Sequence, residues 1–240
     1  MSIEEEDQVD SDALESRAIA VFDAGQFEEA ARLYSRLSSL QPDNPVVHSC
    51  LGNTLKHLGR MDEALIAHER AVELAPEAAR LWANFGGAYL AAGQIESAIE
   101  ASAKAVGFAP KDAEMHFNLG TVLHSARRYK QACAVFERAL DLDPNHPRVH
   151  LNLGSSLKVM GNIHEAVSHF AKATNLDPDF ADAQWNLALG LLAVGMWEQG
   201  WERYEWRRKI ADIPKQEYDF PRWDGHNLPD KRLLLHAEQG

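Results

Sequence analysis

The stretch Met115–Gly120 reads MHFNLG, and the stretch Val149–Gly154 reads VHLNLG. Their asparagines, Asn118 and Asn152, lie 34 residues apart. One further step of this length leads to QWNLAL, and one step back leads to WANFGG. An asparagine therefore precedes a large apolar residue and a small one in four places, at a fixed interval. Such an interval predicts a chain built from repeated structural units.

Several other columns of residues keep the same step of 34 residues. One column is proline, one is alanine, one consists of small residues, and one is glycine with a single arginine. In this order the columns are Pro42, Pro76, Pro110, Pro144 and Pro178; Ala30, Ala64, Ala98, Ala132 and Ala166; Ala18, Gly52, Gly86, Gly120, Gly154 and Ala188; and Gly25, Gly59, Gly93, Arg127, Gly161 and Gly195. Columns that share one period indicate a single kind of unit along most of the chain.

These columns resemble the tetratricopeptide repeat, a helix–turn–helix unit of 34 residues. The resemblance extends over six units, and it is fullest in the third, where Trp82, Phe85 and Tyr89 occupy signature positions. The units are about 11–44, 45–78, 79–112, 113–146, 147–180 and 181–213. The resemblance implies an all-α fold, a right-handed superhelical solenoid of about six repeats. Its concave face would be lined mainly by the first helix of each unit.

The repeat predicts twelve main helices in six antiparallel pairs between residues 13 and 213. The glycine column ends each first helix, because glycine adopts the left-handed conformation without steric cost. The turns are therefore expected near these glycines and near Arg127. The acidic residues 1–12 are expected to be disordered, since they carry high charge and few apolar side chains.

The charge and hydropathy of the chain exclude several classes of partner. Lys and Arg total 24 against 36 Asp and Glu, which gives a formal net charge of −12, whereas nucleic-acid-binding domains are basic. An anionic membrane surface is disfavoured for the same reason. No apolar run approaches the roughly 18 residues needed to span a bilayer, and the first residues are acidic, unlike a secretory signal. We expect a cytoplasmic protein with a protein or peptide partner, no nucleic acid and no membrane.

No sequence motif for catalysis, cofactor binding or metal binding is present: HExxH, CxxC, GxxxxGK[ST] and GxSxG are all missing. His48, His116 and His150 share one column. Residues in one column of a stacked solenoid lie ~9–10 Å apart, too far to share a zinc ion whose ligands stand at ~2.0–2.1 Å. We interpret these histidines as packing residues, and Cys50 and Cys133 as small buried apolar residues. The sequence predicts no catalytic, cofactor-binding or metal-binding residue and no cofactor.

An aromatic cluster lies near the end of the periodic region. Trp197, Trp201 and Tyr204 follow the i, i+4, i+7 spacing of one helix face, and Trp206 is close by. The cluster could form a ligand box or a core. We interpret it as a core that covers the end of the solenoid or docks a following domain.

The asparagine column allows two interpretations. Asparagine is a mediocre helix former, so four in one register require a reason. The amides could bond the neighbouring first helix and stiffen the stack. They could instead pair with the backbone of an extended peptide, because an amide offers donors and an acceptor. The second interpretation is supported by a resemblance: the column is similar to the asparagine ladder on the concave wall of the nucleocytoplasmic O-linked N-acetylglucosamine transferase. The candidate peptide-binding residues are Asn84, Asn118, Asn152 and Asn186.

The period ends after Ile213, and residues 214–240 are expected to form a linker and the truncated start of a following α/β domain. The pattern WEQGWERYEWR, FPRWDG and KRLLLHAEQG resembles the junction in bacterial proteins that join such an array to a glycosyltransferase-like domain of two Rossmann-like halves, similar to the heptosyltransferases. RLLLH would be the first strand of that domain, and Glu238, Gln239 and Gly240 the start of its glycine-containing loop. The resemblance assigns no catalytic residue to this chain.

Two functions remain open at this point. In the first, the chain is a protein- or peptide-binding scaffold that uses its concave groove and forms the N-terminal arm of a larger protein. In the second, it is the substrate-recruiting region of a bacterial glycosyltransferase whose catalytic domain is missing from this chain. In neither is the chain itself an enzyme. The partner, the sugar donor and acceptor, the activity of the parent protein and the oligomeric state are not determined by the sequence.

Overall fold

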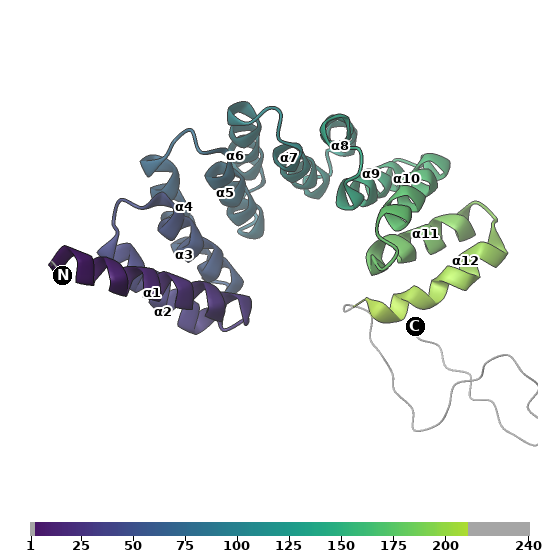
Figure 1. Ribbon diagram of the computed structural model, residues 1–240. Coiled ribbons are helices and arrows are strands. Elements are labelled where there is room, and N and C mark those ends of the chain that lie inside the picture. Colours follow the sequence, from purple (N-terminus) through teal and green to yellow (C-terminus); the bar gives the residue numbers. More distant parts are fainter. Residues whose placement is uncertain (1–2, 211–240) are drawn as a thin grey trace, which may run out of the picture.

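The computed structural model describes residues 3–210, which form α-helices joined by short turns (Figure 1). The helices are α1 (Ile3–Asp23), α2 (Phe27–Leu40), α3 (Pro45–His57), α4 (Met61–Leu74), α5 (Ala79–Ala91), α6 (Ile95–Phe108), α7 (Ala113–Ser125), α8 (Tyr129–Leu142), α9 (Pro147–Val159), α10 (Ile163–Leu176), α11 (Ala181–Ala193), α12 (Trp197–Tyr204) and the short 3-10 helix η1 (Glu205–Lys209). Residues 3–210 contain no β-strand. The predicted all-α class and the twelve helices are confirmed.

The helices form an arch, with α5, α7 and α9 on its inner side and α6 and α8 on its outer side (Figure 1). Each helix packs against the next one in the chain. The first helices of the repeats also contact one another directly, α3 with α5, α5 with α7, α7 with α9, and α9 with α11. The inner, concave side of the arch is therefore a continuous layer of first helices.

The turn within each repeat is made by the glycine column. Gly93 has φ +74°, and a Cβ atom built on it would meet nothing within 4 Å, so its conformation rather than crowding requires glycine. The other four glycines of the column also have positive φ, and Arg127 has φ +58°. Among residues 3–210, Arg127 is the only residue other than glycine with positive φ. The predicted turn positions are confirmed, including the one without glycine.

The small-residue column marks the place where the two helices of a repeat cross. A Cβ atom on Gly120 would lie 2.5 Å from the Phe136 ring, and one on Gly154 would lie 2.7 Å from the Phe170 ring. Both phenylalanines are fully buried. Glycine on the first helix therefore makes room for a large ring on the second.

The start of the chain differs from the prediction. In place of disorder in residues 1–12, helix α1 begins at Ile3. Within α1, Ser11 is buried, and its hydroxyl accepts a hydrogen bond from Gln41 Nε2 at 2.6 Å. The expectations for residues 214–240, including the strand RLLLH and the loop at Glu238, Gln239 and Gly240, lie outside the described residues.

Within residues 3–210, none of the helices is both long enough and apolar enough to cross a membrane.

Candidate peptide-binding groove

The four asparagines of the candidate site lie one on each of four inner helices. Asn84 is on α5, Asn118 on α7, Asn152 on α9 and Asn186 on α11. All four are partly buried. Because these helices contact one another in sequence along the concave layer, the asparagines form a row across it.

Two of the amides bond the preceding first helix. Asn84 Nδ2 donates to Ser49 Oγ of α3 at 3.0 Å, and Asn152 Nδ2 donates to Thr121 Oγ1 of α7 at 3.3 Å. These are the inter-helix bonds that a stiffening role requires. For Asn118 the described part of the chain offers no hydrogen-bond partner within reach.

Asn186 is held differently from the other asparagines. Its Oδ1 accepts a hydrogen bond from Lys158 Nζ at 2.7 Å, and its Nδ2 donates to the Asp182 carbonyl at 2.9 Å. Burial lowers the pKa of Lys158 from its ordinary value, and Asn186 supplies this half-buried ammonium with an acceptor. The row is therefore not a uniform ladder, because both ends of the Asn186 amide are occupied.

A depression of about 420 Å³ opens across α7, α9 and α11. Its lining residues are Phe117, Thr121, Pro147, Arg148, Leu151, Asn152, Asp177, Phe180 and Asp182. Four of them are apolar, two are acidic and one is basic. The depression thus combines an apolar surface with charges of both signs, and one of the candidate asparagines lies within it.

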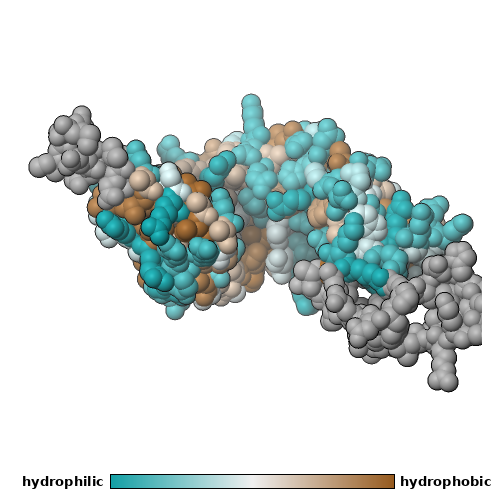
Figure 2. Space-filling view, turned by 60° about the horizontal axis from the view of Figure 1, so that its bottom comes forward, coloured by the Kyte–Doolittle hydropathy of each residue, from teal (hydrophilic) through white to brown (hydrophobic). Residues whose placement is uncertain are grey.

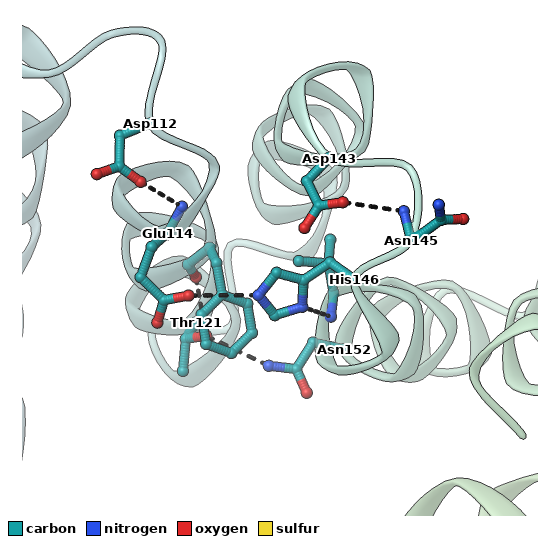
Figure 3. A network of polar contacts seen from close by, with 9 residues as sticks. Asp112, Glu114, Thr121, Asp143, Asn145, His146 and Asn152 are labelled. Carbon is teal, nitrogen blue, oxygen red and sulfur yellow. Dashed lines mark hydrogen bonds and ion pairs between the residues drawn. The ribbon is translucent and has the colours of Figure 1, made fainter. Parts of the chain in front are cut away.

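The amide oxygen of Asn152 is available inside this depression. Thr121 accepts the Asn152 amide hydrogen and donates its own hydrogen to the Phe117 carbonyl at 2.9 Å, so the hydroxyl has no hydrogen left to give to the Asn152 oxygen. Figure 3 shows the Asn152 oxygen turned away from Thr121. Among residues 3–210 this oxygen has no hydrogen-bond donor, so the structure fixes the amide through its nitrogen and leaves its acceptor free.

Phe117, which lines the depression, is supported by a histidine from the neighbouring repeat. His146 stands at the N-cap of α9, where its Nδ1 accepts the Val149 backbone N–H at 3.4 Å. Its Nε2 must then carry the hydrogen and donate to the Glu114 carboxylate at 3.3 Å (Figure 3). The ring stacks on Phe117 with centroids 5.3 Å apart. The Arg148 guanidinium also packs on Phe117, 4.5 Å from the ring centroid.

Figure 2 looks into the opening of the arch and shows a hollowed face of mixed character. Hydrophobic residues gather over the N-terminal helices, and hydrophilic residues dominate the C-terminal half. The depression of α7, α9 and α11 therefore belongs to the more polar half of the molecule.

The histidine column has a role that the sequence reasoning missed. Each member of the column donates a side-chain hydrogen bond to the carbonyl of the proline six residues earlier. The pairs are His48 with Pro42 at 2.9 Å, Trp82 with Pro76 at 2.7 Å, His116 with Pro110 at 3.0 Å, His150 with Pro144 at 3.2 Å and Gln184 with Pro178 at 2.9 Å. What the members of this column have in common is a side-chain N–H donor, not an aromatic ring. Each of these bonds joins the loop between two repeats to the first helix of the following repeat. Within residues 3–210, no group of three or more His, Cys, Asp and Glu side chains is placed to hold a metal ion.

The two tryptophans of the aromatic cluster on α12 are not part of a core within residues 3–210, and the alternative that they dock a following domain lies outside the described residues. Trp197 and Trp201 are 61% and 57% exposed. The neighbouring Tyr204 does pack inward, with its ring 4.9 Å from that of Trp185 on α11. The physical reason is that α12 is the last α-helix of the described part, so no further repeat in residues 3–210 covers its outer face.

Both cysteines lie in apolar surroundings rather than in a reactive site. Cys133 is buried and Cys50 is half-buried. Burial raises the pKa of both thiols, which disfavours the nucleophilic thiolate.

A family model described as the C-terminal domain of cilia and flagella-associated protein 70 matches residues 1–220. The chain belongs to this family. Among curated proteins, FlbA of Caulobacter vibrioides is 42% identical over 52 residues, which is 21% of this chain and 9% of FlbA. The matched part is therefore a small fraction of that relative.

Solved structures confirm the tetratricopeptide-repeat fold of this family member. PilF of Pseudomonas aeruginosa is 18% identical, with a TM-score of 0.71 over 86% of this chain and 94% of PilF. TTC0263 of Thermus thermophilus is 23% identical, with a TM-score of 0.65 over 76% of this chain and 99% of TTC0263. YrrB, described as a tetratricopeptide-repeat protein with an unusual peptide-binding site, is 25% identical, with a TM-score of 0.55 over 74% of this chain and 91% of YrrB.

Proposed function

We propose that this chain is a scaffold that holds an extended segment of a partner protein along its concave groove, with the asparagine row contacting the segment's backbone. The observation that carries the proposal is Asn152. This residue lines the depression of α7, α9 and α11, is fixed through its nitrogen to Thr121, and keeps its oxygen free. A free amide oxygen held in place can accept a peptide N–H with little further loss of side-chain entropy.

The spacing of the row supports backbone contact. Neighbouring inner helices pack at ~9–10 Å, which equals about three residues of an extended peptide at ~3.3 Å each. Successive asparagines can therefore meet every third peptide unit. Asn118 and Asn152 are the strongest members of the row, because Asn186 is already bonded at both ends of its amide. The likeness to YrrB, whose description names a peptide-binding site, supports the same class of partner.

The test is the double substitution Asn118→Ala and Asn152→Ala in the full chain. Each neutral hydrogen bond contributes ~0.5–1.5 kcal/mol, so the loss of two should weaken binding about tenfold or more, at 1.4 kcal/mol per decade. The affinity for an immobilised pool of random-sequence decapeptides is measured by surface plasmon resonance. Asn175→Ala is the matched control, since Asn175 is an exposed asparagine on the outer-layer helix α10.

A purely structural role of the row predicts a different result. The double variant would then melt at a lower temperature, while its affinity per folded molecule would equal that of the wild type. Thr121→Val separates the two roles further, because it removes the bond between Asn152 and the preceding helix, together with the bond from Thr121 to the Phe117 carbonyl, but leaves the Asn152 side chain in place. A structural row would make Thr121→Val as destabilising as Asn152→Ala.

As a second function we propose that the groove recruits substrates for a glycosyltransferase domain encoded after residue 240. Its support is the resemblance of the C-terminal sequence, from WEQGWERYEWR to KRLLLHAEQG, to such a junction. The parent reading frame provides the test. A downstream region of alternating helices and strands with two Rossmann-like halves is the expected finding, and a stop codon directly after Gly240 would contradict it.

A further inference from the structure

A column of alternating charge runs beside the asparagine row. One helical turn before each asparagine stands a charged residue, in the order Arg80, Glu114, Arg148 and Asp182. Residues four apart on a helix share one face, so each charge stands beside its asparagine on the same inner helix. The sign changes at every repeat, from α5 through α7 and α9 to α11.

The side chains of this column are placed to meet a ligand in the groove. Arg148 and Asp182 both line the depression that contains Asn152. The Glu114 side chain stays 46% exposed even though it bonds His146. Arg80 is exposed. The column therefore presents plus, minus, plus and minus at successive repeats of the concave layer.

The spacing of the inner helices that carry these charges matches the repeat of one chain conformation. Neighbouring inner helices lie ~9–10 Å apart. Three residues of polyproline II rise about 9.3 Å and complete one turn, which brings every third side chain to the same face. A β-strand has a period of two residues, so its residues i and i+3 would point to opposite sides. A polyproline II segment can thus oppose every charge of the column, whereas a β-strand cannot.

We propose that the groove selects a partner segment in polyproline II conformation that carries a charged residue at every third position, alternating in sign. Acidic residues lie opposite Arg80 and Arg148, and basic residues lie opposite Glu114 and Asp182. An apolar side chain between the last two charges enters the depression against Phe117. This inference rests on the proposed function, since it specifies the segment that the same groove binds.

The experiment compares two labelled decapeptides of equal composition and zero net charge. One has the order Glu-x-x-Lys-x-x-Glu-x-x-Lys and the other has Glu-x-x-Glu-x-x-Lys-x-x-Lys, with proline and alanine at x and one leucine between the last two charges. When the second peptide lies along the whole column, two of its four charges face a protein charge of the same sign, whichever direction the peptide runs. We expect it to bind the full chain about tenfold more weakly by fluorescence polarisation at low salt. In about 1 M salt, where the Debye length is about 3 Å, the difference should nearly vanish.

A charge inversion in the protein should change the preference. The double variant Arg148→Glu and Asp182→Lys keeps the net charge but changes the column to plus, minus, minus, plus. It should favour Glu-x-x-Lys-x-x-Lys-x-x-Glu over the alternating peptide. Arg148→Lys with Asp182→Glu is the matched control and should keep the wild-type preference. If the double variant does not fold by circular dichroism, Asp182→Lys alone, at an exposed site, should still reduce affinity for the alternating peptide.

The outcomes separate this inference from the proposed function. Equal affinity of the wild type for both peptides, within about twofold, together with weakening by the Asn118→Ala and Asn152→Ala pair, would overturn the charge pattern and leave peptide binding in place. If the wild type binds neither these peptides nor the random pool, both proposals are wrong. A changed preference in the inverted variant, with the control unchanged, would support both.

Discussion

His68 shows how one side chain can couple this fold to pH. It occupies the column in which later repeats carry Phe136 and Phe170, and it packs on Gly52 as they pack on their glycines. It is fully buried, and neither ring nitrogen has a hydrogen-bond partner. Burial, together with the nearby Lys56 ammonium, lowers the pKa of His68 to about 4. The folded state therefore requires the neutral ring.

The replacement His68→Phe should stabilise the protein and reduce its acid sensitivity. An unfolded histidine titrates near pH 6.5. Between about pH 6.5 and 4 the unfolded chain binds a proton that folded His68 excludes, so this stability is complete above about pH 6.5 and is lost as the pH falls toward 4, by about 3 kcal/mol. The variant should lack this loss and gain about 1–3 kcal/mol at neutral pH by removing the unpaired polar groups. Urea unfolding at several pH values measures both, and an unchanged pH profile would contradict the assignment.

The donor column gives a second prediction for a single residue. His116→Leu still fills the site with a bulky side chain but loses the bond to the Pro110 carbonyl, and should reduce the free energy of unfolding by about 1 kcal/mol. His116→Gln should cost less, because Gln184 already makes the equivalent bond. Thermal melts of the two variants provide the comparison. Equal losses would show that the column selects for shape and not for a donor.

At the scale of single helices, the close contact between the two helices of a repeat leads to a prediction for glycine substitutions. In Gly120→Ala the new methyl would lie 2.5 Å from the Phe136 ring, so α7 and α8 must move apart, at a cost of about 1–3 kcal/mol. Gly107→Ala on α6 is the matched control, because its methyl meets nothing within 4 Å. That change should stabilise by about 0.5–1 kcal/mol, since glycine is the weaker helix former. Urea unfolding should give opposite signs for the two variants, and a shared sign would contradict the crossing argument.

The whole solenoid is unevenly stabilised. One connected cluster of buried residues extends from Phe117 on α7 to Leu191 on α11. Residues 11–115 instead contain smaller separate clusters. In a repeat protein, stability is the sum of the repeats and their nearest-neighbour interfaces. The N-terminal repeats should therefore open first.

Hydrogen exchange measured by mass spectrometry checks this order. Amides of α8, α9 and α10 should exchange most slowly and those of α1 to α4 faster. Phe170→Ala, in the large cluster, should accelerate exchange in α7 to α11 and leave α1 to α4 unchanged. Uniform acceleration along the whole chain would mean that the array unfolds as one cooperative unit.

What the sequence determined by itself is the periodic part of this protein. The 34-residue step, the twelve helices and the turn at Arg127 were all predictable, because helix ends and left-handed turns depend on residues within a few positions of one another. The crossing points were predictable for a related reason, since the small-residue column records where two adjacent helices must approach.

Only the tertiary structure decided which side chains meet across repeats. The bonds of Asn84 to Ser49 and of Asn152 to Thr121, which join residues 35 and 31 positions apart, do not follow one offset that a sequence column could reveal. The same holds for the depression of α7, α9 and α11 and for the exposure of Trp197. These features depend on how far and at what angle each repeat is displaced from the last. That displacement depends on how neighbouring helix pairs pack against each other, so it cannot be predicted from the sequence of one repeat alone.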